Sequence, residues 1–515
     1  MISAQEQERF NAYWQSLHQD GTLMFAGKLL ERAAKQWPKR IAYICGDESI
    51  TYRELFRRAC LVSNQLRALG VGSEEKVLIW YENSIEFFIA YYGVWHTGAV
   101  VAALNVFLHP REFEHIITDA RPKVVIISDQ LLAKLDDAIK NNLPLRIDQA
   151  YIENTRELPG PSRCDIAKKD PDALAVLLYT SGTTGMPKGV MLSSRNLLMN
   201  VVQAISLLKL SPQDRCYVPV PLFHSLAQNA AVWSTIFMGA SCVVVPKIDR
   251  RALLDGLKHN PTVILAVPSL YAIFCLMKTA PFKNVRYFIS GGDALPDKIR
   301  AAFALIYGRK ICNGYGMTET SPLIAAHVID ERVSADTVGD PVLGMQCSLR
   351  KDDQEVAQGE VGVLWVKGDN VMLGYYNAQE ATHAILKDGW LNTGDLAQFD
   401  SAGRLHIVGR EKDLISNKGF KIYPQEIENV LLSHPSVLMA AVIGVKDGGS
   451  DEIPVAYVTL KHVLKDAQAE LHALCAQQLA TYKIPRMFIV KSALPITAMG
   501  KIDKKQLRAE HDKKD

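Results

Sequence analysis

A stretch rich in glycine and hydroxyl side chains, residues 179–189, has the composition of a phosphate-binding loop. It reads YTSGTTGMPKG and follows an apolar run, residues 173–179, that has the length of a buried strand. Glycines let the backbone approach a phosphate closely, and hydroxyl groups add donors or a metal ligand. In a Walker A loop the lysine directly follows the last glycine. Here two residues separate Gly185 from Lys188, so this stretch is not a Walker A loop. For this loop alone, a flexible turn remains the alternative.

Four further stretches complete a pattern that is specific as a set. They are residues 313–320 (NGYGMTET), residues 393–395 (TGD), Arg410 and residues 495–501 (PITAMGK). With YTSGTTGMPKG they resemble the adenylate-forming superfamily, which includes acyl-CoA synthetases, luciferases and peptide-synthetase adenylation domains. The resemblance covers nearly the whole chain, in the family's order and at its spacing.

The resemblance implies a binding site for ATP. The phosphate loop would comprise Thr180, Ser181, Gly182, Thr183, Thr184, Gly185 and Lys188. On one side of the adenine would lie Asn313, Gly314 and Tyr315, with Tyr315 stacked on its face. On the other side would lie Gly291, Gly292 and Asp293. Gly316, Met317 and Thr318 would complete this site. Asp395 would accept hydrogen bonds from the ribose hydroxyls, and Arg410 would add donors. Read alone, Tyr315 fits a core aromatic, Asp395 an Asx turn and Arg410 an interdomain salt bridge.

The resemblance also implies the catalytic groups of the first half-reaction. Glu319 would bind Mg²⁺ with help from the Thr184 hydroxyl, although alone it reads as a surface carboxylate. Lys501 would reach both the substrate carboxylate and the α-phosphate, because attack brings two anions together and builds charge on the phosphoryl oxygens. The alternative for Lys501 is a solvated lysine in a basic tail.

A mobile C-terminal domain would serve the second half-reaction. Lys412 is at the family's hinge position, and the domain is expected to swing between two states. One state presents Lys501, and the other places Lys418, Gly419 and Phe420 beside the pantetheine arm of CoA, the expected co-substrate.

The acyl site is expected near the segment PLFHS, residues 221–225. His224 gates the route between carboxylate and thiol or is a core histidine, and the sequence favours neither. Amino-acid-activating relatives carry an aspartate where Phe223 stands, so a free amino acid is disfavoured because its ammonium would be buried unpaired. Apolar residues 230–233 suit an apolar acyl group or form ordinary helix core.

The elements that position these residues follow an alternating pattern. Strands at residues 76–80, 100–104 and 123–128 alternate with helices that begin near residues 84 and 110, as in a parallel α/β fold. The strand–helix–strand pattern of residues 98–128 is echoed at residues 239–267, which predicts two similar α/β subdomains. The polar segment between them, about residues 129–170, contains no residue pattern that indicates a function.

Later segments predict a small β-rich subdomain at residues 337–410 and a separate α+β domain of roughly 100 residues. The expected boundaries are an N-terminal domain at residues 1–409, a hinge at residues 410–412 and a mobile C-terminal domain at residues 413–515.

The composition of the chain limits the classes of function to be considered. The chain has 515 residues, a net charge of +3 and no concentrated basic stripe, so nucleic acid is not an expected partner. Residues 87–108 lack charged side chains, but two glycines interrupt them, so no membrane span is expected. Nine scattered cysteines fit free thiols in a reducing compartment better than disulfides or a zinc site. We expect a cytoplasmic enzyme, with peripheral membrane contact and a homodimer left open.

The predicted activity is that of an ATP- and Mg²⁺-dependent acid–thiol ligase. A carboxylic acid, in the first place a fatty acid, would form acyl-AMP with release of pyrophosphate, and CoA would then capture the acyl group. The alternative acceptor is the phosphopantetheine of a holo acyl carrier protein. A more distant alternative is a non-catalytic ATP-binding protein, which the joint presence of Lys188, Glu319, Asp395, Arg410 and Lys501 argues against.

Overall fold

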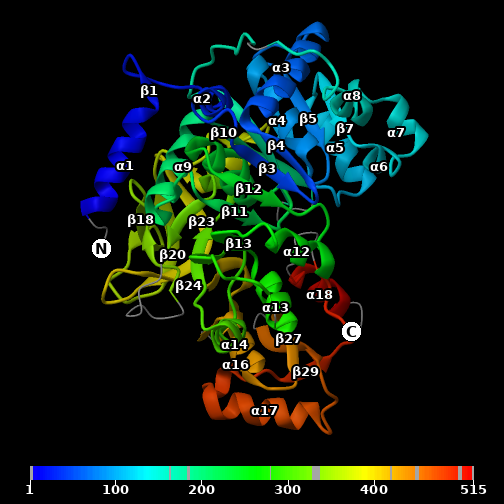
Figure 1. The fold of residues 1–515 in the computed structure, drawn as a ribbon. Helices are drawn as coiled ribbons and strands as arrows, with labels where there is room; N and C mark the ends of the chain where they lie inside the picture. The colour runs from blue at the N-terminus through cyan, green and yellow to red at the C-terminus, as the bar shows by residue number, and fades with distance from the viewer. Residues whose placement is uncertain are drawn as a thin grey trace.

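The computed structural model (Figure 1) describes residues 4–161, 164–181, 186–278, 280–327, 337–417, 420–446, 452–496 and 502–512. A large N-terminal part, blue to yellow, occupies the upper region of Figure 1, and a smaller C-terminal part, orange to red, lies below it. The mixed α/β class predicted from the alternating pattern is confirmed.

The first large sheet has seven strands in the order β21–β10–β9–β6–β5–β7–β8. Their bounds are β5 (Lys76–Trp80), β6 (Val100–Ala103), β7 (Val124–Ile127), β8 (Leu145–Asp148), β9 (Leu174–Ser181), β10 (Pro187–Ser193) and β21 (Gly374–Tyr375). Strands β5 to β9 pair in parallel, and β10 and β21 extend the sheet in antiparallel fashion. The central strands β6 and β7 are apolar and fully buried, as helices on both faces of a parallel sheet require.

The second large sheet has nine strands in the order β17–β16–β15–β14–β13–β11–β12–β3–β4. Their bounds are β3 (Ile41–Cys45), β4 (Glu48–Thr51), β11 (Arg215–Val218), β12 (Ser241–Val244), β13 (Val263–Ala266), β14 (Tyr287–Ser290), β15 (Cys312–Gly316), β16 (Leu323–Ala326) and β17 (Asp340–Pro341). Strands β3 and β11 to β15 pair in parallel, whereas β4, β16 and β17 pair antiparallel at the two edges.

The internal repeat predicted from the sequence is present in both sheets. In the first copy, β6 leads through α5 (Pro110–Ala120) to β7, and β5 lies between the two strands. In the second, β12 leads through α12 (Arg250–Leu257) to β13, and β11 lies between them. In both copies the helix therefore connects two parallel strands that have one other strand between them. This shared connection confirms two similar α/β subdomains.

The uncharged stretch at residues 87–108 is a buried helix followed by a strand. It contributes most of α4 (Ile85–Thr97). Ser84 is the N-cap of this helix, and Gly98, with a φ of 84°, is its left-handed C-cap. Helix α4 packs against α3 (Tyr52–Ala68). Among the helices that the structure describes, none combines the length and apolar character needed to cross a bilayer.

Shorter elements complete the N-terminal part. The polar segment at residues 129–170, for which the sequence offered no interpretation, contains α6 to α8 and the edge strand β8. The remaining helices and small strands are α1 (Ala4–Ser16), β1 (His18–Gln19), β2 (Thr22–Leu23), η1 (Ala26–Lys28), α2 (Leu29–Gln36), α6 (Asp129–Leu132), α7 (Asp137–Asn141), α8 (Gln149–Asn154), α9 (Ser194–Leu208), α10 (Ser225–Ala227), η2 (Gln228–Ser234), α11 (Thr235–Met238), α13 (Pro268–Met277), α14 (Asp297–Tyr307), η3 (Thr318–Thr320) and α15 (Gln379–Ile385).

A third, antiparallel sheet forms the predicted β-rich subdomain. Its strands are β18 (Gln346–Lys351), β19 (Gln354–Glu355), β20 (Gly362–Lys367), β22 (Leu386–Lys387), β23 (Trp390–Phe399) and β24 (Leu405–Arg410). The order is β19–β18–β20–β23–β22, with β24 paired to β23. Strand β24 ends at Arg410, where the short turn η4 (Glu411–Asp413) begins.

The C-terminal part is a small α+β unit with its own apolar clusters. It contains β25 (Ile415–Asn417), β26 (Phe420–Ile422), α16 (Pro424–Ser433), β27 (Val437–Lys446), β28 (Glu452–Leu460), α17 (Ala467–Gln478), η5 (Thr481–Lys483), β29 (Met487–Val490) and α18 (Lys504–His511). The α+β character predicted for the segment beyond residue 410 is confirmed, whereas the domain boundary itself remains a prediction.

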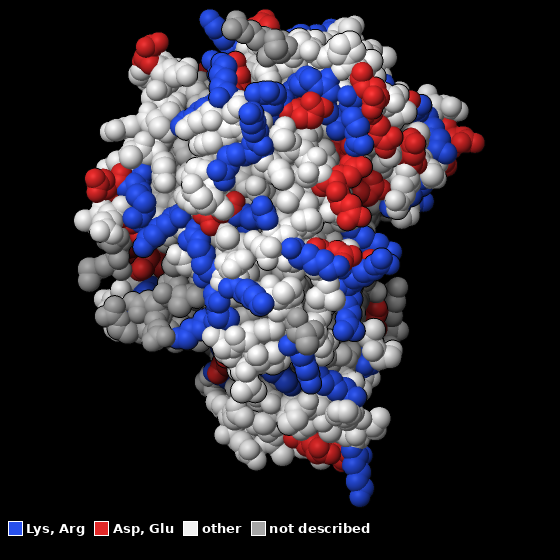
Figure 2. Space-filling view, viewed as in Figure 1, with Lys and Arg blue, Asp and Glu red and all other residues white. Residues whose placement is uncertain are grey.

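Charged side chains are unevenly spread on the face shown in Figure 2. Acidic side chains gather at the upper right, over the region of α5 to α8 in Figure 1, whereas lysine and arginine side chains are scattered over the rest of this face.

Candidate active site

The predicted phosphate loop connects the two strands of a β-hairpin. Strands β9 and β10 pair antiparallel, with Lys188 opposite Thr180 and Pro187 opposite Ser181. The strand after the turn explains why this loop differs from a Walker A loop, in which a helix begins directly after the glycines. Gly182, Thr183, Thr184 and Gly185, the predicted tip of the loop, lie outside the described residues.

Lys188 and Glu319 are connected through a residue that the sequence reasoning missed, Tyr375. The Lys188 ammonium lies 5.5 Å from the centre of the Tyr375 ring. The Tyr375 hydroxyl donates a hydrogen bond to Glu319 Oε1 at 2.7 Å. Strand β21 makes this possible, because it pairs Tyr375 with Val190 of β10. The pairing of β21 with β10 is long-range, so no local sequence signal identified Tyr375.

Glu319 is a buried carboxylate and not the surface group that its sequence alone would allow. It lies in η3 and is 8% exposed. Burial raises the pKa of Glu319, and the hydrogen bond from Tyr375 opposes that shift. A carboxylate buried near the groups predicted to bind phosphate fits a divalent cation, because a hard cation stabilises the charge that burial penalises. The donor chemistry around Glu319 therefore suits Mg²⁺.

Tyr315, Asp395 and Arg410 form a second cluster. The Tyr315 hydroxyl donates to Asp395 Oδ2 at 2.5 Å, and Arg410 Nε lies 3.2 Å from Asp395 Oδ1. Strands β23 and β24 place Asp395 directly opposite Arg410. Burial and the Asp395 carboxylate raise the pKa of Tyr315, which remains a neutral donor. The Asx-turn alternative does not describe Asp395, because its carboxylate binds Tyr315 and Arg410, while its backbone N–H donates to Thr393 Oγ1 at 3.1 Å.

The glycine segment at residues 291–293 lies beside the segment at residues 313–316. Strands β14 and β15 pair in parallel, with Ser290 opposite Asn313. Residues 291–293 follow the carboxyl end of β14, and residues 313–316 form most of β15. A Cβ on Gly291 would lie 3.7 Å from the Gly314 carbonyl oxygen, so the two backbones approach closely. Crevices at the carboxyl ends of parallel strands are where open α/β sheets bind ligands. Asp293 is exposed, and its Oδ1 accepts a hydrogen bond from the Ala294 N–H at 2.9 Å.

The segment Gly316 to Thr318 turns sharply between β15 and η3. A Cβ on Gly316 would come within 1.9 Å of the Pro322 carbonyl oxygen, so this position requires glycine. The Met317 N–H donates to the same oxygen at 2.9 Å. Thr318 Oγ1 lies 3.2 Å from Ser225 Oγ, which brings the segment at residues 221–225 to the edge of the site.

Comparison with known proteins identifies the family to which this arrangement belongs. Residues 30–376 match the AMP-binding enzyme family, and residues 426–501 match the AMP-binding enzyme C-terminal domain. The chain belongs to the AMP-binding enzyme family. It is therefore an enzyme of the adenylate-forming class of acid–thiol ligases, and the resemblance inferred from the five motifs is confirmed.

Individual relatives of the family differ in the acid named for them. A long-chain-fatty-acid–CoA ligase of Bacillus subtilis (strain 168) is 30% identical over 94% of both chains. The structure of an anthranilate CoA ligase with anthranoyl-AMP has a TM-score of 0.89 at 27% identity, covering 94% of this chain and 97% of the other. The o-succinylbenzoate CoA synthetase of Bacillus subtilis, solved with ATP and magnesium ion, has a TM-score of 0.85 at 30% identity, covering 93% and 99%.

His224 caps the short helix α10 at the edge of the AMP-binding site. Its Nδ1 accepts a hydrogen bond from the Leu226 N–H at 3.2 Å, and its side chain is half-buried. Partial exposure does not fit the core histidine that was the alternative at this position. A gating role for His224 remains a prediction.

Of the residues expected to act from the small domain, the structure describes Phe420 and Lys412. Phe420 is 52% exposed, and its ring stacks on Tyr482 with centroids 4.6 Å apart. Lys412 lies in η4, and the adjacent Asp413 binds Arg508 of α18 at 2.9 Å. The remaining predicted residues of this domain, Lys418, Gly419 and Lys501, lie outside the described residues.

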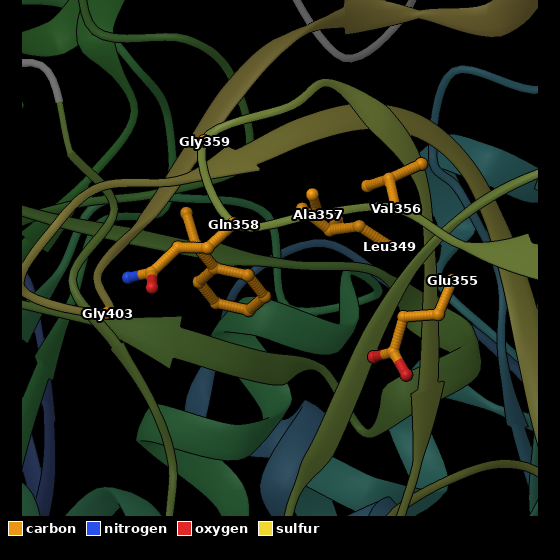
Figure 3. Close-up of a pocket in the computed structure, with 8 residues that line it drawn as sticks. Leu349, Glu355, Val356, Ala357, Gln358, Gly359 and Gly403 are labelled. Carbon is orange, nitrogen blue, oxygen red and sulfur yellow. The ribbon is translucent and has the colours of Figure 1, made fainter.

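The pocket shown in Figure 3 lies elsewhere, in the β-rich subdomain. It is lined by Leu349, Glu355, Val356, Ala357, Gln358, Gly359, Phe399 and Gly403. These lining residues include an acidic side chain and no basic one, and none of the predicted site residues is among them. The pocket is therefore unsuited to a nucleotide.

Proposed function

We propose that this enzyme activates an apolar carboxylic acid, in the first place a fatty acid, as acyl-AMP and transfers the acyl group to CoA. The observation that carries the proposal is a pair of side-chain clusters, joined by hydrogen bonds, an ion pair and a cation–π contact, in an AMP-binding enzyme. One cluster joins Lys188, Tyr375 and Glu319, and the other joins Tyr315, Asp395 and Arg410. The first has the charges needed for magnesium-bound phosphates, and the second has the groups needed for a nucleoside.

In the first half-reaction, the two clusters would hold opposite ends of ATP. The hairpin turn between β9 and β10, with Lys188, would bind the β- and γ-phosphates, which leave together as pyrophosphate. Glu319, with the Thr184 hydroxyl, would hold Mg²⁺, which neutralises charge on the phosphate oxygens when it is bound. Tyr315 would stack on adenine while Asp395 accepts hydrogen bonds from the ribose hydroxyls.

Lys501 would supply the charge that the fixed clusters lack at the reacting atoms. A carboxylate oxygen of the acid attacks the α-phosphorus, the bond to the bridging oxygen breaks, and pyrophosphate departs. An ammonium that contacts both the carboxylate and the α-phosphate lowers the repulsion between these anions. In the second half-reaction the thiol of CoA attacks the acyl carbon, loses its proton, and displaces AMP.

The choice of acid rests on the surroundings of residues 221–233. Three of the four apolar residues at 230–233 are fully buried in η2, namely Ala231, Val232 and Trp233. Their burial favours a role in the helix core over contact with the acyl group. Ala230 is half-buried. The half-buried Phe223 ring packs edge-on against the exposed ring of Phe107, with centroids 6.5 Å apart. This aromatic pair supports an apolar acyl group or an aryl acid more than an amino acid.

Pyrophosphate exchange tests the proposal. The enzyme would be incubated with ATP, Mg²⁺, labelled pyrophosphate and one acid at a time, from short, medium and long fatty acids to aryl acids. We expect exchange with at least one fatty acid, at a rate above that with aryl acids of similar size. Exchange with aryl acids only would overturn the fatty-acid assignment, and exchange with none would contradict the activity.

The acceptor needs a separate measurement. Once an exchanging acid is known, CoA and a holo acyl carrier protein would be offered in parallel reactions, with apo carrier protein as the control. We expect a thioester with CoA. Thioester formation on the carrier protein alone would assign the enzyme to the alternative acceptor.

A further inference from the structure

Two cysteines and a histidine from three separate segments converge away from the nucleotide site. Cys60 lies on α3, His96 lies in the last turn of α4, and Cys164 lies on the segment that leads into β9. One ligand atom from each residue lies within 4.8 Å of the other two. Cys164 Sγ is 3.4 Å from His96 Nδ1. The adenylation chemistry described above uses none of these groups.

The separation between the Cys164 sulfur and the His96 nitrogen matches a tetrahedral metal centre. Two thiolates and an imidazole are ligands that Zn²⁺ takes in proteins, at about 2.3 Å for sulfur and about 2.0 Å for nitrogen. Tetrahedral angles at those bond lengths place sulfur and nitrogen about 3.5 Å apart and the two sulfurs about 3.8 Å apart. The observed 3.4 Å between Cys164 Sγ and His96 Nδ1 is close to the first value, and the 4.8 Å limit accommodates the second.

Burial and charge are also consistent with a bound cation. Cys60 and His96 are 0% exposed, and Cys164 is half-buried. Two thiolates cancel the charge of a divalent cation, so the loaded site is neutral and can be buried at low cost. The partial exposure of Cys164 provides an entry path and leaves the fourth ligand position to water, as in other zinc sites with three protein ligands.

The backbone around the cluster is tied together independently of any metal. The His96 carbonyl accepts hydrogen bonds from the Ala167 N–H at 3.0 Å and from Arg67 Nη2 at 2.8 Å. Arg67 also donates to the Asp165 carbonyl. These contacts hold α3, α4 and the segment before β9 in one arrangement, so the three ligands are positioned in advance.

One feature limits the expected affinity. A histidine that ligates a metal usually donates its other ring N–H to an acceptor, and loss of that partner costs about 10- to 100-fold in affinity. His96 Nε2 has no hydrogen-bond partner in the described part of the chain, and the ring packs edge-on against Phe56 at 5.4 Å. The ring is therefore held by packing and by the contact of its Nδ1 with Cys164 Sγ.

We propose that Cys60, His96 and Cys164 form a zinc site, with water as the fourth ligand, that fastens the segment before the phosphate hairpin onto α3 and α4. The sequence favoured free thiols over a zinc site because these residues are far apart along the chain, and only the fold brings them together. In a reducing compartment such a cluster fits a metal better than a disulfide.

Metal titration of the tag-free, fully reduced enzyme tests this site. A thiol assay would first confirm nine free cysteines. Zn²⁺ would then be titrated against a chromogenic chelator, and Co²⁺ would be used to detect thiolate ligands by their charge-transfer absorption. We expect one equivalent with a Kd between about 10 nM and 10 μM. A hundredfold excess of free Zn²⁺ over Kd should raise Tm by about 3 °C.

Variants locate the binding. Cys164→Ser and His96→Gln should each weaken Zn²⁺ binding at least about tenfold. Cys475→Ser, which alters a buried thiol of α17 in the small domain, should leave binding unchanged. Binding that survives Cys164→Ser would overturn the proposal.

The Co²⁺ spectrum of the wild-type enzyme tests for thiolate ligands even if a variant does not fold. Absence of thiolate charge transfer in the reduced wild-type enzyme would overturn the proposal. So would a Cys60–Cys164 disulfide in the isolated protein that, once reduced, still gives no metal uptake.

Discussion

The two halves of the proposed active site differ in how their side chains are held. In the large domain, Tyr315, Glu319 and Asp395 are bonded to partners from other strands of the same domain. In the small domain, Phe420 is stacked on Tyr482 and Asp413 is paired with Arg508, both within that domain. Under the proposed function, the first half would be preorganised for ATP, and the second half would have to be brought to it. We therefore expect substitutions in the large domain to impair adenylation. Substitutions at the domain junction should change the rate of one half-reaction more than the rate of the other.

The largest effect is expected from Lys501→Ala. We propose that this ammonium contacts both reacting anions, so its loss should slow acyl-AMP formation by about 1,000-fold or more. Thioester formation from added acyl-AMP should be nearly unchanged, because that step does not join two anions at phosphorus. Single-turnover assays of each half-reaction would measure this, with Lys505→Ala as a neighbouring control. Equal loss in both half-reactions would refute the assigned role.

Glu319→Gln should reduce adenylation by about 100-fold, mainly through weaker use of Mg²⁺. Burial raises the pKa of Glu319, so protons compete with the cation at higher pH than they would at an exposed glutamate. The apparent Mg²⁺ affinity of the wild type should therefore fall as pH falls through that raised pKa, and excess Mg²⁺ should restore the rate. Glu157→Gln is a matched exposed control. A wild-type Mg²⁺ affinity that is constant over this pH range would contradict the metal-ligand role.

Lys412→Pro should separate the half-reactions in the opposite sense. Proline restricts the residue before it, Glu411, away from helical dihedral angles, and so it limits the conformations of η4. Thioester formation should fall by roughly 10- to 100-fold while adenylation changes little, because only the second step needs the alternative domain orientation. Lys412→Ala removes the charge without restricting the backbone and should retain both activities. If Lys412→Ala reproduces the defect, the side chain and not a hinge is responsible.

Tyr375→Phe tests the connection that the structure revealed. It removes the hydrogen bond to Glu319 while keeping the ring beside Lys188, so the carboxylate loses one donor. We expect the KM for MgATP to rise by about 5- to 10-fold, with kcat reduced less. The measurement is adenylation kinetics at varied MgATP, with Tyr376→Phe as the adjacent control. A fall in kcat alone would indicate that Tyr375 acts in the chemical step.

Much of the fold could be predicted because apolar strands and capped helices leave local signals. Strand β5 has the expected bounds, and helices α4 and α5 begin close to the expected positions. The common topology of the two sheets followed from a repeated strand–helix–strand pattern. Strand β8 could not be recognised, because it is an edge strand with mostly exposed residues in a polar segment.

The site was predictable only where its residues lie within the recognisable motifs. Glu319 and Asp395 were found that way, but Tyr375 was not, since its position depends on β21 pairing with β10 across a long stretch of sequence. The cluster of Cys60, His96 and Cys164 is a similar case. Each of these arrangements arises from contacts between distant segments, which single-sequence periodicity does not report.

The smallest effect is expected at the junction of the two domains. Lys298 Nζ of α14 donates to the carbonyl oxygens of His434 and Val437, at 2.9 and 3.3 Å. Lys298→Ala removes two hydrogen bonds that hold one domain orientation, which should change the ratio of the two half-reaction rates by about 2- to 5-fold. Lys283→Ala, on the same domain, should leave the ratio unchanged. If Lys298→Ala changes both rates by the same factor, the contact supports folding and does not set the orientation of the small domain.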